Sequence, residues 1–332
     1  MPQIPSDPVV VVTGGSSGIG LATASAFARR GASVVIAARG HDRLDQAASE
    51  CRALGAAAVL AVPTDVTDVG QVQELADAAL RRFGRIDVWA NVAGTSLWGP
   101  FEEIPLETHT RLIQLDLLGA VNGCAAVVPH MLERGGPGVV VNIVSFAGRV
   151  PTPWATSYSA AKFGLAGFTD ALRYELAGRS DIAVCGVYPA YVDTPTYRAS
   201  GNYTNRSLRP VPPVVPPERV ADAVVRLTVR PRRAVRVGAL NAASLPYALA
   251  PGRVGTLAAR VLGNYLLRSG PPAPRTDGAL FRPSPGAALV RGGWGLPERA
   301  RARRATVSAG LGLACASAVV VSRRLTRRAA RP

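Results

Sequence analysis

Close to the N-terminus this 332-residue chain reads Val9-Val10-Val11-Val12-Thr13-Gly14-Gly15-Ser16-Ser17-Gly18-Ile19-Gly20. The four valines are β-branched and apolar, as in a strand buried on both faces of a parallel sheet. The glycine-rich turn leads into a helical pattern that continues to about Arg30. Backbone N–H groups at a helix N-terminus attract anions, and glycines allow an anion to approach closely. The stretch therefore predicts a strand, a turn and a helix that bind the pyrophosphate of a dinucleotide.

The pattern of short apolar runs and longer helical segments repeats along the next two hundred residues. Strands are expected at 33–38, 57–62, 86–91, 138–144, 182–187 and 234–237, and helices at 41–54, 68–83, 107–134, from about 156, and at 218–230. Repeated β-α units of this length imply right-handed crossovers. The expected fold class is therefore α/β, a doubly wound parallel sheet of Rossmann type.

Arg39 follows the second expected strand, where an NAD-binding protein usually presents an acidic residue to the ribose 2′-hydroxyl. A guanidinium at this place suits a 2′-phosphate, which it can bind through charge-assisted hydrogen bonds. NADP(H) is therefore expected in preference to NAD(H), the alternative being a solvated arginine. Asp65 and Val66 follow the third strand and are expected to contact the adenine end of the cofactor.

Tyr158 and Lys162 stand four residues apart, so a helix places them on one face. Lys162 is the only lysine among 38 basic residues. A cation within about 4–6 Å lowers the pKa of a phenol, which otherwise titrates near 10. The tyrosine can then exchange a proton with an alcohol or a carbonyl. Ser145 ends the preceding apolar run and is expected to hydrogen-bond the same substrate oxygen.

Together these motifs resemble the short-chain dehydrogenase/reductase family over residues 8 to about 240. The matching residues are Thr13-Gly14-x-x-x-Gly18-x-Gly20, Asp65, Asn91-x-Ala93-Gly94, Ser145, Tyr158-x-x-x-Lys162, and Pro189 through Thr194. No single motif is specific, but the combination in this order and spacing is.

The resemblance implies a role for each matching residue. Tyr158 would be the general acid/base, Ser145 would orient the substrate oxygen, and Lys162 would hold the nicotinamide ribose. Asn91 would stabilise the central strand, and Thr194 would reach the nicotinamide carboxamide. The expected cofactor site comprises Thr13, Gly14, Ser16, Ser17, Gly18, Ile19, Gly20, Arg39, Asp65, Val66, Asn91, Ala93, Gly94, Tyr158, Lys162, Pro189, Val192 and Thr194.

Two positions depart from the family pattern. The family commonly has an asparagine in the helix pattern N-x-x-G, where it supports a water that links the lysine to solvent. Here the pattern reads Asp116-Leu117-Leu118-Gly119. An aspartate adds a charge and lacks the amide donor, so whether the family's proton relay operates here is an open question. Asp116 is nevertheless counted with the catalytic residues. The usual Pro-Gly is Pro189-Ala190, a milder change.

The distribution of charge and the few cysteines and histidines limit which kinds of binding site and which cellular location the sequence allows. Residues 1–200 hold 15 basic and 18 acidic side chains, whereas residues 201–332 hold 23 basic and 4 acidic ones, so the net charge of +16 belongs to the C-terminal part. Four scattered cysteines and three histidines favour neither a metal site nor a disulfide framework. The N-terminus lacks a basic start and an apolar leader, which predicts no signal peptide and a cytoplasmic location.

The loops expected to cover the nicotinamide are rich in aromatic residues. Together they indicate an apolar or aromatic alcohol or ketone as substrate, although each alone suits an ordinary core or surface position. Two arginines of the same region suit an anionic substrate if they are not simply solvated. The aromatic residues are Trp98, Trp154, Tyr188, Tyr191, Tyr197 and Tyr203, and the arginines are Arg149 and Arg198.

A catalytic domain is expected over 1–240 and a C-terminal extension over 241–332. Helices are expected within 243–268 and a Pro/Gly-rich linker over 270–297. Residues 305–322 are uncharged between arginine clusters, and as a helix they would span about 27 Å, close to a bilayer core. Attachment to an anionic membrane and packing on the domain or a partner subunit both stay open, whereas nucleic acid is disfavoured.

The sequence therefore predicts an NADP(H)-dependent oxidoreductase that acts on a carbonyl or a secondary alcohol and, by the resemblance, forms a homo-oligomer. The alternative is a non-catalytic NADP-binding sensor or a membrane-associated scaffold. Asp116 and the long extension favour that alternative, and the complete set of Ser145, Tyr158 and Lys162 favours the enzyme.

Overall fold

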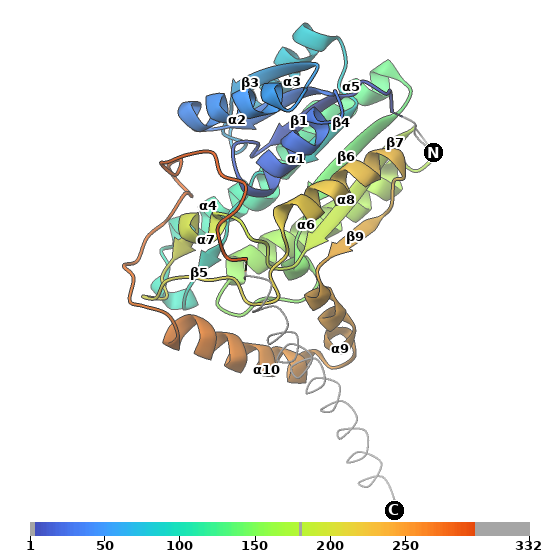
Figure 1. Ribbon diagram of the computed structural model, residues 1–332. Helices are drawn as coiled ribbons and strands as arrows, with labels where there is room; N and C mark the ends of the chain where they lie inside the picture. The colour runs from blue at the N-terminus through green and yellow to red at the C-terminus, as the bar shows by residue number, and fades with distance from the viewer. Residues whose placement is uncertain (1–3, 179–180, 296–332) are drawn as a thin grey trace, which may run out of the picture.

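The computed structural model describes residues 4–178 and 181–295, and its centre is one parallel sheet (Figure 1). Seven strands pair in the order β3-β2-β1-β4-β6-β7-β9, and all neighbours run parallel. The strands are β1 (Val9–Thr13), β2 (Ser33–Ala38), β3 (Ala58–Pro63), β4 (Val88–Asn91), β6 (Gly138–Ile143), β7 (Ile182–Pro189) and β9 (Ala234–Val237). The expected doubly wound α/β sheet is confirmed.

Helices cover both faces of this sheet, which explains why its strands are continuous apolar runs. One layer consists of α1 (Gly18–Ala28), α2 (His41–Ala53) and α8 (Pro217–Val229). The other consists of α3 (Val69–Phe83), α5 (Gly119–Arg134) and α6 (Thr156–Leu176). Successive residues of β1 point into opposite layers: Val10 and Val12 join the core under α1, whereas Val11 joins the core under α3. All three valines are fully buried.

The helix expected over 107–134 has three parts. α4 (Leu106–Ile113) continues through a π-helical segment, Gln114–Leu118, into α5. Such segments are frequent at functional sites, and this one carries Asp116. In the part of the chain that the structure describes, Leu106–Arg134 is the one helix long and apolar enough to cross a membrane, and 56% of its apolar window is buried inside the fold. A core helix of a globular protein has the same properties.

A polar cluster lies inside the second layer, behind the end of β4. The Asn91 side chain donates to Asn142 Oδ1 (2.9 Å) and to the Ala120 carbonyl (3.2 Å), and its own oxygen accepts from Trp89 Nε1 (2.8 Å). Gly123 of α5 lies against this amide, because a Cβ there would be 2.2 Å from Asn91 Oδ1. The expected role of Asn91 in stabilising the central strand agrees with these contacts.

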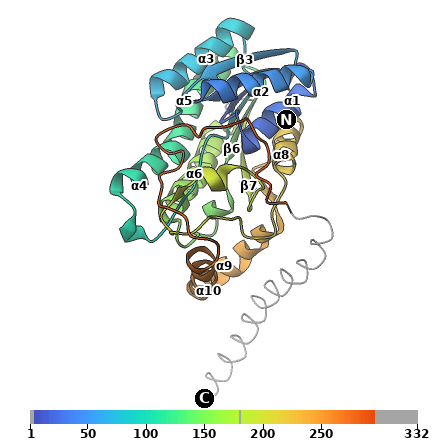
Figure 2. The ribbon, with the colours of Figure 1, turned by 60° about the vertical axis from the view of Figure 1, so that its left-hand side comes forward.

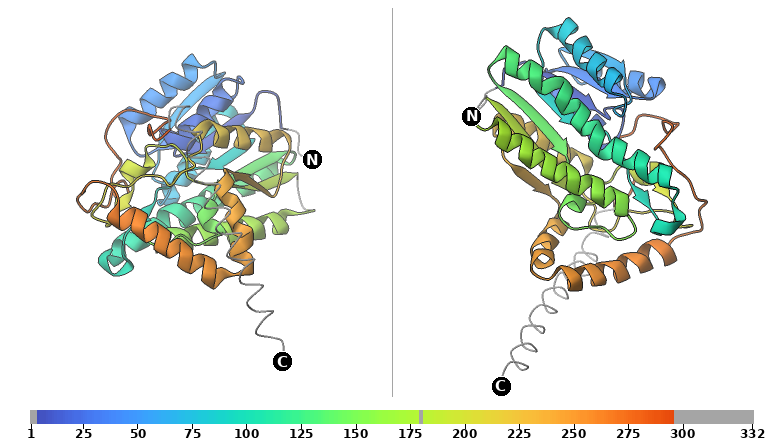
Figure 3. Two further views of the ribbon diagram at one scale, coloured as in Figure 1. Left: turned by 60° about the horizontal axis from the view of Figure 1, so that its bottom comes forward. Right: turned by 180° about the vertical axis from the view of Figure 1, so that it is seen from behind.

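The chain beyond β9 packs under the carboxyl end of the sheet (Figure 3). A 3₁₀ turn, Ala239–Ala243, leads into α9 (Ser244–Leu249), α10 (Pro251–Gly263) and a π-helical turn, Asn264–Arg268. Leu262, Tyr265 and Leu266 pack with Trp98 and Trp154. Helices within 243–268 are therefore confirmed, and the division of the chain near residue 240 remains a prediction.

Three short elements were not expected from the sequence. β5 (Leu97–Trp98) pairs with β8 (Gly201–Asn202) in a small second sheet, and α7 (Thr196–Ala199) precedes β8. They lie on the loops after β4 and β7, close to the end of the sheet where the expected catalytic residues stand.

Residues 270–295 contain no helix or strand, in agreement with the expected loop, but they remain in contact with the domain. Figure 2 shows this chain crossing the molecule between α4 and α8. We call residues 279–295 the strap. The predicted tail segment 305–322 lies outside the described residues.

Candidate active site

A cavity of about 600 Å³ lies at the carboxyl ends of the strands. Its walls include Gly14 after β1, Arg39 after β2, Asp65 after β3, Ser145 after β6 and Pro189 at the end of β7. Open α/β sheets bind their ligands at this edge, and the volume lies in the range of small-molecule sites.

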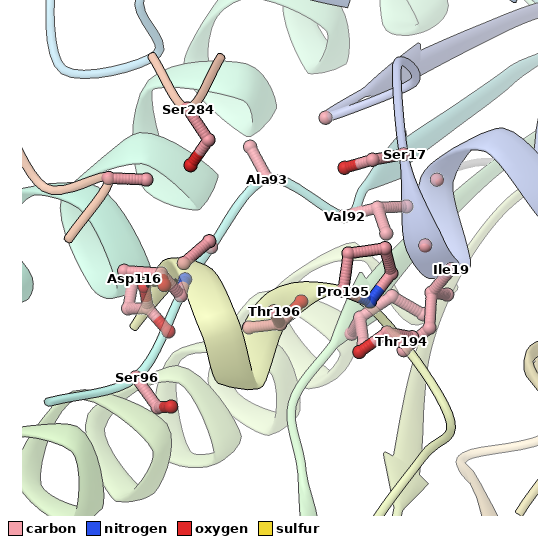
Figure 4. A pocket seen from close by; sticks show the side chains of 18 of the residues that line it. Ser17, Ile19, Val92, Ala93, Ser96, Asp116, Thr194, Pro195, Thr196 and Ser284 are labelled. Carbon is pink, nitrogen blue, oxygen red and sulfur yellow. Dashed lines mark hydrogen bonds between the residues drawn. The ribbon is translucent and has the colours of Figure 1, made fainter. Parts of the chain in front are cut away.

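The structure brings nearly all of the expected site residues to this one cavity. Those that line it are Gly14, Ser16, Ser17, Gly18, Ile19, Gly20, Arg39, Asp65, Val66, Ala93, Gly94, Asp116, Ser145, Tyr158, Lys162, Pro189, Val192 and Thr194. Thr13 and Asn91 lie behind the wall rather than in it. Figure 4 shows Ser17, Ile19 and Thr194 on one side, Val92 and Ala93 along the middle, and Asp116 and Ser96 on the other side.

The turn after β1 is shaped by its glycines. Gly14 has a φ of +67°, and a Cβ there would lie 2.8 Å from Ala93 Cα. A Cβ on Gly20 would lie 2.1 Å from the Gly14 carbonyl. Thr13 Oγ1 accepts from the backbone N–H groups of Val92 (3.0 Å) and Ala93 (3.2 Å), which joins this turn to the loop after β4. The result is a cradle of closely packed backbone at the N-terminus of α1, the kind of site that attracts anions.

Tyr158 and Lys162 lie one turn apart near the start of α6. The Lys162 Nζ is 5.7 Å from the centre of the Tyr158 ring and 3.3 Å from the Ile143 carbonyl of β6, to which it donates. Ser145 Oγ accepts from the Ala147 N–H (3.1 Å), and the Ser145 side chain lies close enough to Tyr158 to lower the pKa of that phenol in part. The φ of Ser145 is 140°, a conformation that side-chain-bearing residues rarely adopt, and such strain is typical of active sites.

Asp116 reaches the same place from the π-helical segment. Its Oδ2 lies 3.0 Å from Lys162 Nζ, and its Oδ1 accepts from the Thr95 N–H at 2.9 Å. The Asp116 side chain is fully buried. The residue that departs from the family pattern is thus the ion-pair partner of the only lysine in the chain.

Burial and these charges set the protonation of the site. Burial raises the pKa of Tyr158, the Lys162 charge lowers it, and Asp116 raises it again, so that the net pKa lies above the usual value. The lysine thus acts in the expected direction, but burial and the carboxylate outweigh it. Burial lowers the pKa of Lys162, whereas Asp116 and Tyr158 raise it by more. The ammonium therefore remains charged at neutral pH.

Arginines surround the end of the cavity where the sequence predicts the adenosine. Arg39 donates through Nη1 to the Leu280 carbonyl (3.0 Å) and through Nη2 to the Ala279 carbonyl, and it lies 4.0 Å from Asp65. Arg43 donates to the Ser284 carbonyl at 3.1 Å. Its Nε is buried and lacks a hydrogen-bond partner within the described part of the chain.

Arg43 and the strap were missed by sequence reasoning. Arg43 lies in the first turn of α2, four residues after Arg39, and this closeness along the chain is the signal that could have indicated it. The strap has no periodic pattern, and its contacts with the cavity join residues about 240 positions apart.

The other end of the cavity is aromatic. Trp98, Tyr191 and Tyr197 line it beside Tyr158, and the rings of Tyr191 and Tyr197 lie 6.4 Å apart. Of the arginines expected near the substrate, Arg198 lines the cavity and lies over the Trp294 ring at 4.5 Å. The remaining candidates, Trp154, Tyr188, Tyr203 and Arg149, are not among the lining residues.

Comparison with known proteins agrees with this geometry. Residues 8–203 match the family described as short chain dehydrogenase. The chain is 33% identical over 278 residues to the uncharacterized oxidoreductase YxnA of Bacillus subtilis. That alignment covers 83% of this chain and 78% of YxnA. It is 36% identical over 229 residues to 3-ketodihydrosphingosine reductase of Bos taurus, in an alignment that covers 67% of this chain and 68% of the reductase.

A solved structure is similar as well. A variant of actinorhodin polyketide ketoreductase with NADPH superposes with a TM-score of 0.63 at 32% sequence identity. The similarity covers 72% of this chain and 98% of that one.

Proposed function

The chain belongs to the short-chain dehydrogenase/reductase family, and we propose that it transfers hydride between NADP(H) and a carbonyl or secondary alcohol of an apolar substrate. That it is a nicotinamide-dependent oxidoreductase follows from the family. The observation that carries the proposal is the meeting of Ser145, Tyr158 and Lys162 in one cavity with the glycine turn of α1.

The cavity fits a dinucleotide. The turn at Gly14 and Gly20 has no room for side chains, and the N-terminus of α1 faces the cavity. When bound, the nicotinamide supplies or accepts the hydride. In carbonyl reduction Tyr158 donates its hydroxyl proton to the substrate oxygen, and in alcohol oxidation the phenolate accepts it. Ser145 holds that oxygen by a hydrogen bond, and the Lys162 ammonium favours the phenolate.

Two features support NADP(H) over NAD(H). No acidic residue follows β2, where Ala38 is succeeded by Arg39 and Gly40. Arg39 and Arg43 both line the cavity, and the Arg43 Nε has no hydrogen-bond partner among the residues that the structure describes. A 2′-phosphate would receive charge-assisted hydrogen bonds from both guanidinium groups.

The aromatic end of the cavity supports an apolar ketone or alcohol. Trp98, Tyr191 and Tyr197 surround the place beside Tyr158 where the reacting carbon would lie. Two relatives are named as reductases of keto groups, namely 3-ketodihydrosphingosine reductase and a polyketide ketoreductase.

The test is NADPH consumption against a panel of aldehydes, ketones and quinones, with Tyr158→Phe as the variant. Tyr174→Phe is the matched control, because Tyr174 is exposed on the same helix and does not line the cavity. Turnover that is lost in Tyr158→Phe and retained in Tyr174→Phe, with NADPH binding intact in both, supports the enzyme. Tight NADPH binding without turnover of any substrate would favour the alternative, a cofactor sensor or scaffold.

We also propose that the C-terminal part contacts an anionic membrane surface. Residues 239–268 include no Asp or Glu. The face of α9 and α10 turned away from the domain exposes Leu245, Leu249, Leu257 and Val261 together with Arg260. Apolar and basic side chains on one helical face suit the boundary of an anionic bilayer.

Sedimentation with vesicles tests the membrane proposal. Binding to phosphatidylserine vesicles that weakens with salt supports it, and Leu249→Ser with Leu257→Ser should reduce that binding. Equal recovery with neutral vesicles, anionic vesicles and no vesicles would contradict it, as would a preference for DNA. A cytoplasmic location and a homo-oligomer remain predictions, the latter from a family whose members are typically oligomeric.

A further inference from the structure

The strap follows the cavity along its whole length. It begins at Ala279 and Leu280, whose carbonyls accept from Arg39 beside Asp65. Near its other end, Trp294 donates through Nε1 to the Thr194 carbonyl (3.0 Å). Asp65 follows β3 and Thr194 follows β7, toward opposite edges of the sheet, and both line the cavity. Seven strap residues line it as well: Ala279, Pro283, Ser284, Pro285, Gly286, Ala287 and Leu289.

Both ends of the strap are firmly anchored. The Leu280 side chain is fully buried in the core under α3 and α5. Arg111 donates through Nε to the Leu280 carbonyl at 3.1 Å. At the other end the buried Asp193 carboxylate accepts from three backbone N–H groups, those of Gly292 (3.1 Å), Trp294 (2.7 Å) and Gly295 (3.1 Å).

The middle of the strap is held by fewer contacts. Ser284 accepts from Arg43, and the Ala288 N–H donates to Gln46 Oε1 at 2.9 Å. The Leu289 carbonyl accepts from the Gly18 N–H, also at 2.9 Å, directly over the cradle of α1. Residues 281–283, 285–287, 289 and 291 are exposed. Opening the middle therefore breaks these hydrogen bonds, the ion pair of Arg291 with Glu218 and the packing of Ala288 and Val290 on the core under α1, while both anchors stay in place.

We propose that the strap is part of the dinucleotide site, that it encloses the bound cofactor, and that the cofactor exchanges only when residues 281–291 lift. The strap covers the cavity without filling it, since about 600 Å³ remains between the strap and the ends of the strands. Arg39 and Arg43 are bound to strap carbonyls at the place where the 2′-phosphate is expected. The inference rests on the nicotinamide cofactor of the family and not on the substrate proposed above.

A reversible crosslink between the strap and the domain tests this inference. A Cβ built on Gly40 lies 3.5 Å from Pro283 Cβ and meets no other neighbour within 4 Å. That separation lies in the disulfide range, and the extended backbone of Gly40 (φ −89°, ψ 117°) accepts a side chain. The variant is Gly40→Cys with Pro283→Cys. Cys51, Cys124 and Cys185 are buried, and every protein compared also carries Cys315→Ser, which removes the remaining thiol.

The measurement is NADPH exchange, followed by fluorescence while excess NADP⁺ displaces NADPH. Protein loaded with NADPH and then oxidised should release it at least about tenfold more slowly than the same protein after reduction. Protein oxidised before loading should take NADPH up equally slowly. The single variants Gly40→Cys and Pro283→Cys cannot form the crosslink, so each should exchange NADPH at one rate whether it has been oxidised or reduced.

Two outcomes would overturn the inference. Exchange at the same rate in the oxidised and reduced protein would mean that the strap does not gate the cofactor. Expulsion of NADPH on oxidation would mean that the closed strap excludes the cofactor instead of enclosing it. Because the readout is binding, a failure to find a substrate leaves this test unaffected.

Cleavage by chymotrypsin after Phe281 gives a second readout on the wild-type chain. Phe281 is 44% exposed and is the first residue of the part that lifts. NADPH should slow this cleavage, because the enclosed cofactor favours the closed strap. Cleavage at the same rate with and without NADPH would contradict the proposed coupling.

Discussion

Replacing Asp116 by asparagine removes the charge that opposes Lys162 and restores the residue common in the family. The carboxylate Oδ2 lies 3.0 Å from Lys162 Nζ, and Nζ lies 5.7 Å from the centre of the Tyr158 ring. The carboxylate is therefore at most about 9 Å from that ring, where Coulomb's law with an effective dielectric constant of about 20 gives a repulsion of roughly 2 kcal/mol with a phenolate. One pKa unit corresponds to about 1.4 kcal/mol, so Asp116→Asn should lower the pKa of Tyr158 by about one unit.

The sign of the effect on activity follows from the role of the tyrosine. In alcohol oxidation the phenolate is the base, so the rate rises as the pH passes the pKa of Tyr158. In carbonyl reduction the phenol is the acid, so the rate falls above that pKa. The pH at which the oxidation rate rises and the pH at which the reduction rate falls should both be lower by about one unit in Asp116→Asn. The assay is kcat/KM as a function of pH in both directions, with the best substrate found in the panel.

The control for this experiment is Asp170→Asn. Asp170 is a partly buried carboxylate bound to Arg173 and Arg233 and does not line the cavity. Its replacement should leave the pH dependence of kcat/KM as it is in the wild type. The electrostatic account would be refuted if the pH dependence of kcat/KM did not change in Asp116→Asn. This holds for a variant that still unfolds cooperatively and binds NADPH. The Thr95 hydrogen bond survives the substitution, because the asparagine oxygen can also accept it.

Three further outcomes are expected. Arg39→Ala should weaken binding of NADPH about tenfold more than binding of NADH, measured by fluorescence titration, and equal losses would contradict a 2′-phosphate contact. Asp170→Asn should lower the thermal midpoint at neutral pH. A hydrogen bond from Arg233 holds the pKa of Asp170 below its usual value, so its contribution to stability is full above the unfolded pKa and is lost as the pH falls through the folded one. The difference in midpoint should shrink below about pH 4, and a difference independent of pH would rule this cause out. Gly123→Ala should cost about 1–3 kcal/mol of unfolding free energy in urea, because its Cβ would overlap the buried amide behind β4. Gly167→Ala, exposed in α6 with nothing within 4 Å, should instead stabilise by about 1 kcal/mol, and similar effects of the two would refute the packing argument.

The sheet and most of the cavity wall could be predicted because they depend on local sequence. A strand that is buried on both faces must be an apolar run, and four consecutive valines from Val9 to Val12 predict such a strand directly. The glycine turn and the four-residue spacing of Tyr158 and Lys162 are likewise short-range features. Parallel strands then bring their carboxyl ends to one edge, so local motifs far apart in the chain meet in one cavity.

The short pair β5 and β8 was beyond such reasoning. Each strand has two residues, too few for a periodic pattern, and they pair only because the loops after β4 and β7 lie together. The state of Tyr158 is another example. The sequence showed the lysine that lowers its pKa, whereas the burial and the carboxylate that raise it depend on the packed environment.

The α/β sheet, the glycine turn before α1 and the set of Ser145, Tyr158 and Lys162 could be read from the amino-acid sequence alone. Each of these follows from residue types at short, regular spacing. The pairing of Asp116 with Lys162 and the course of the strap along the cavity became visible only in the folded structure. Both are contacts between residues 46 or more positions apart, and such contacts depend on how the whole chain packs. The strap in addition has no periodic pattern from which its path could be predicted.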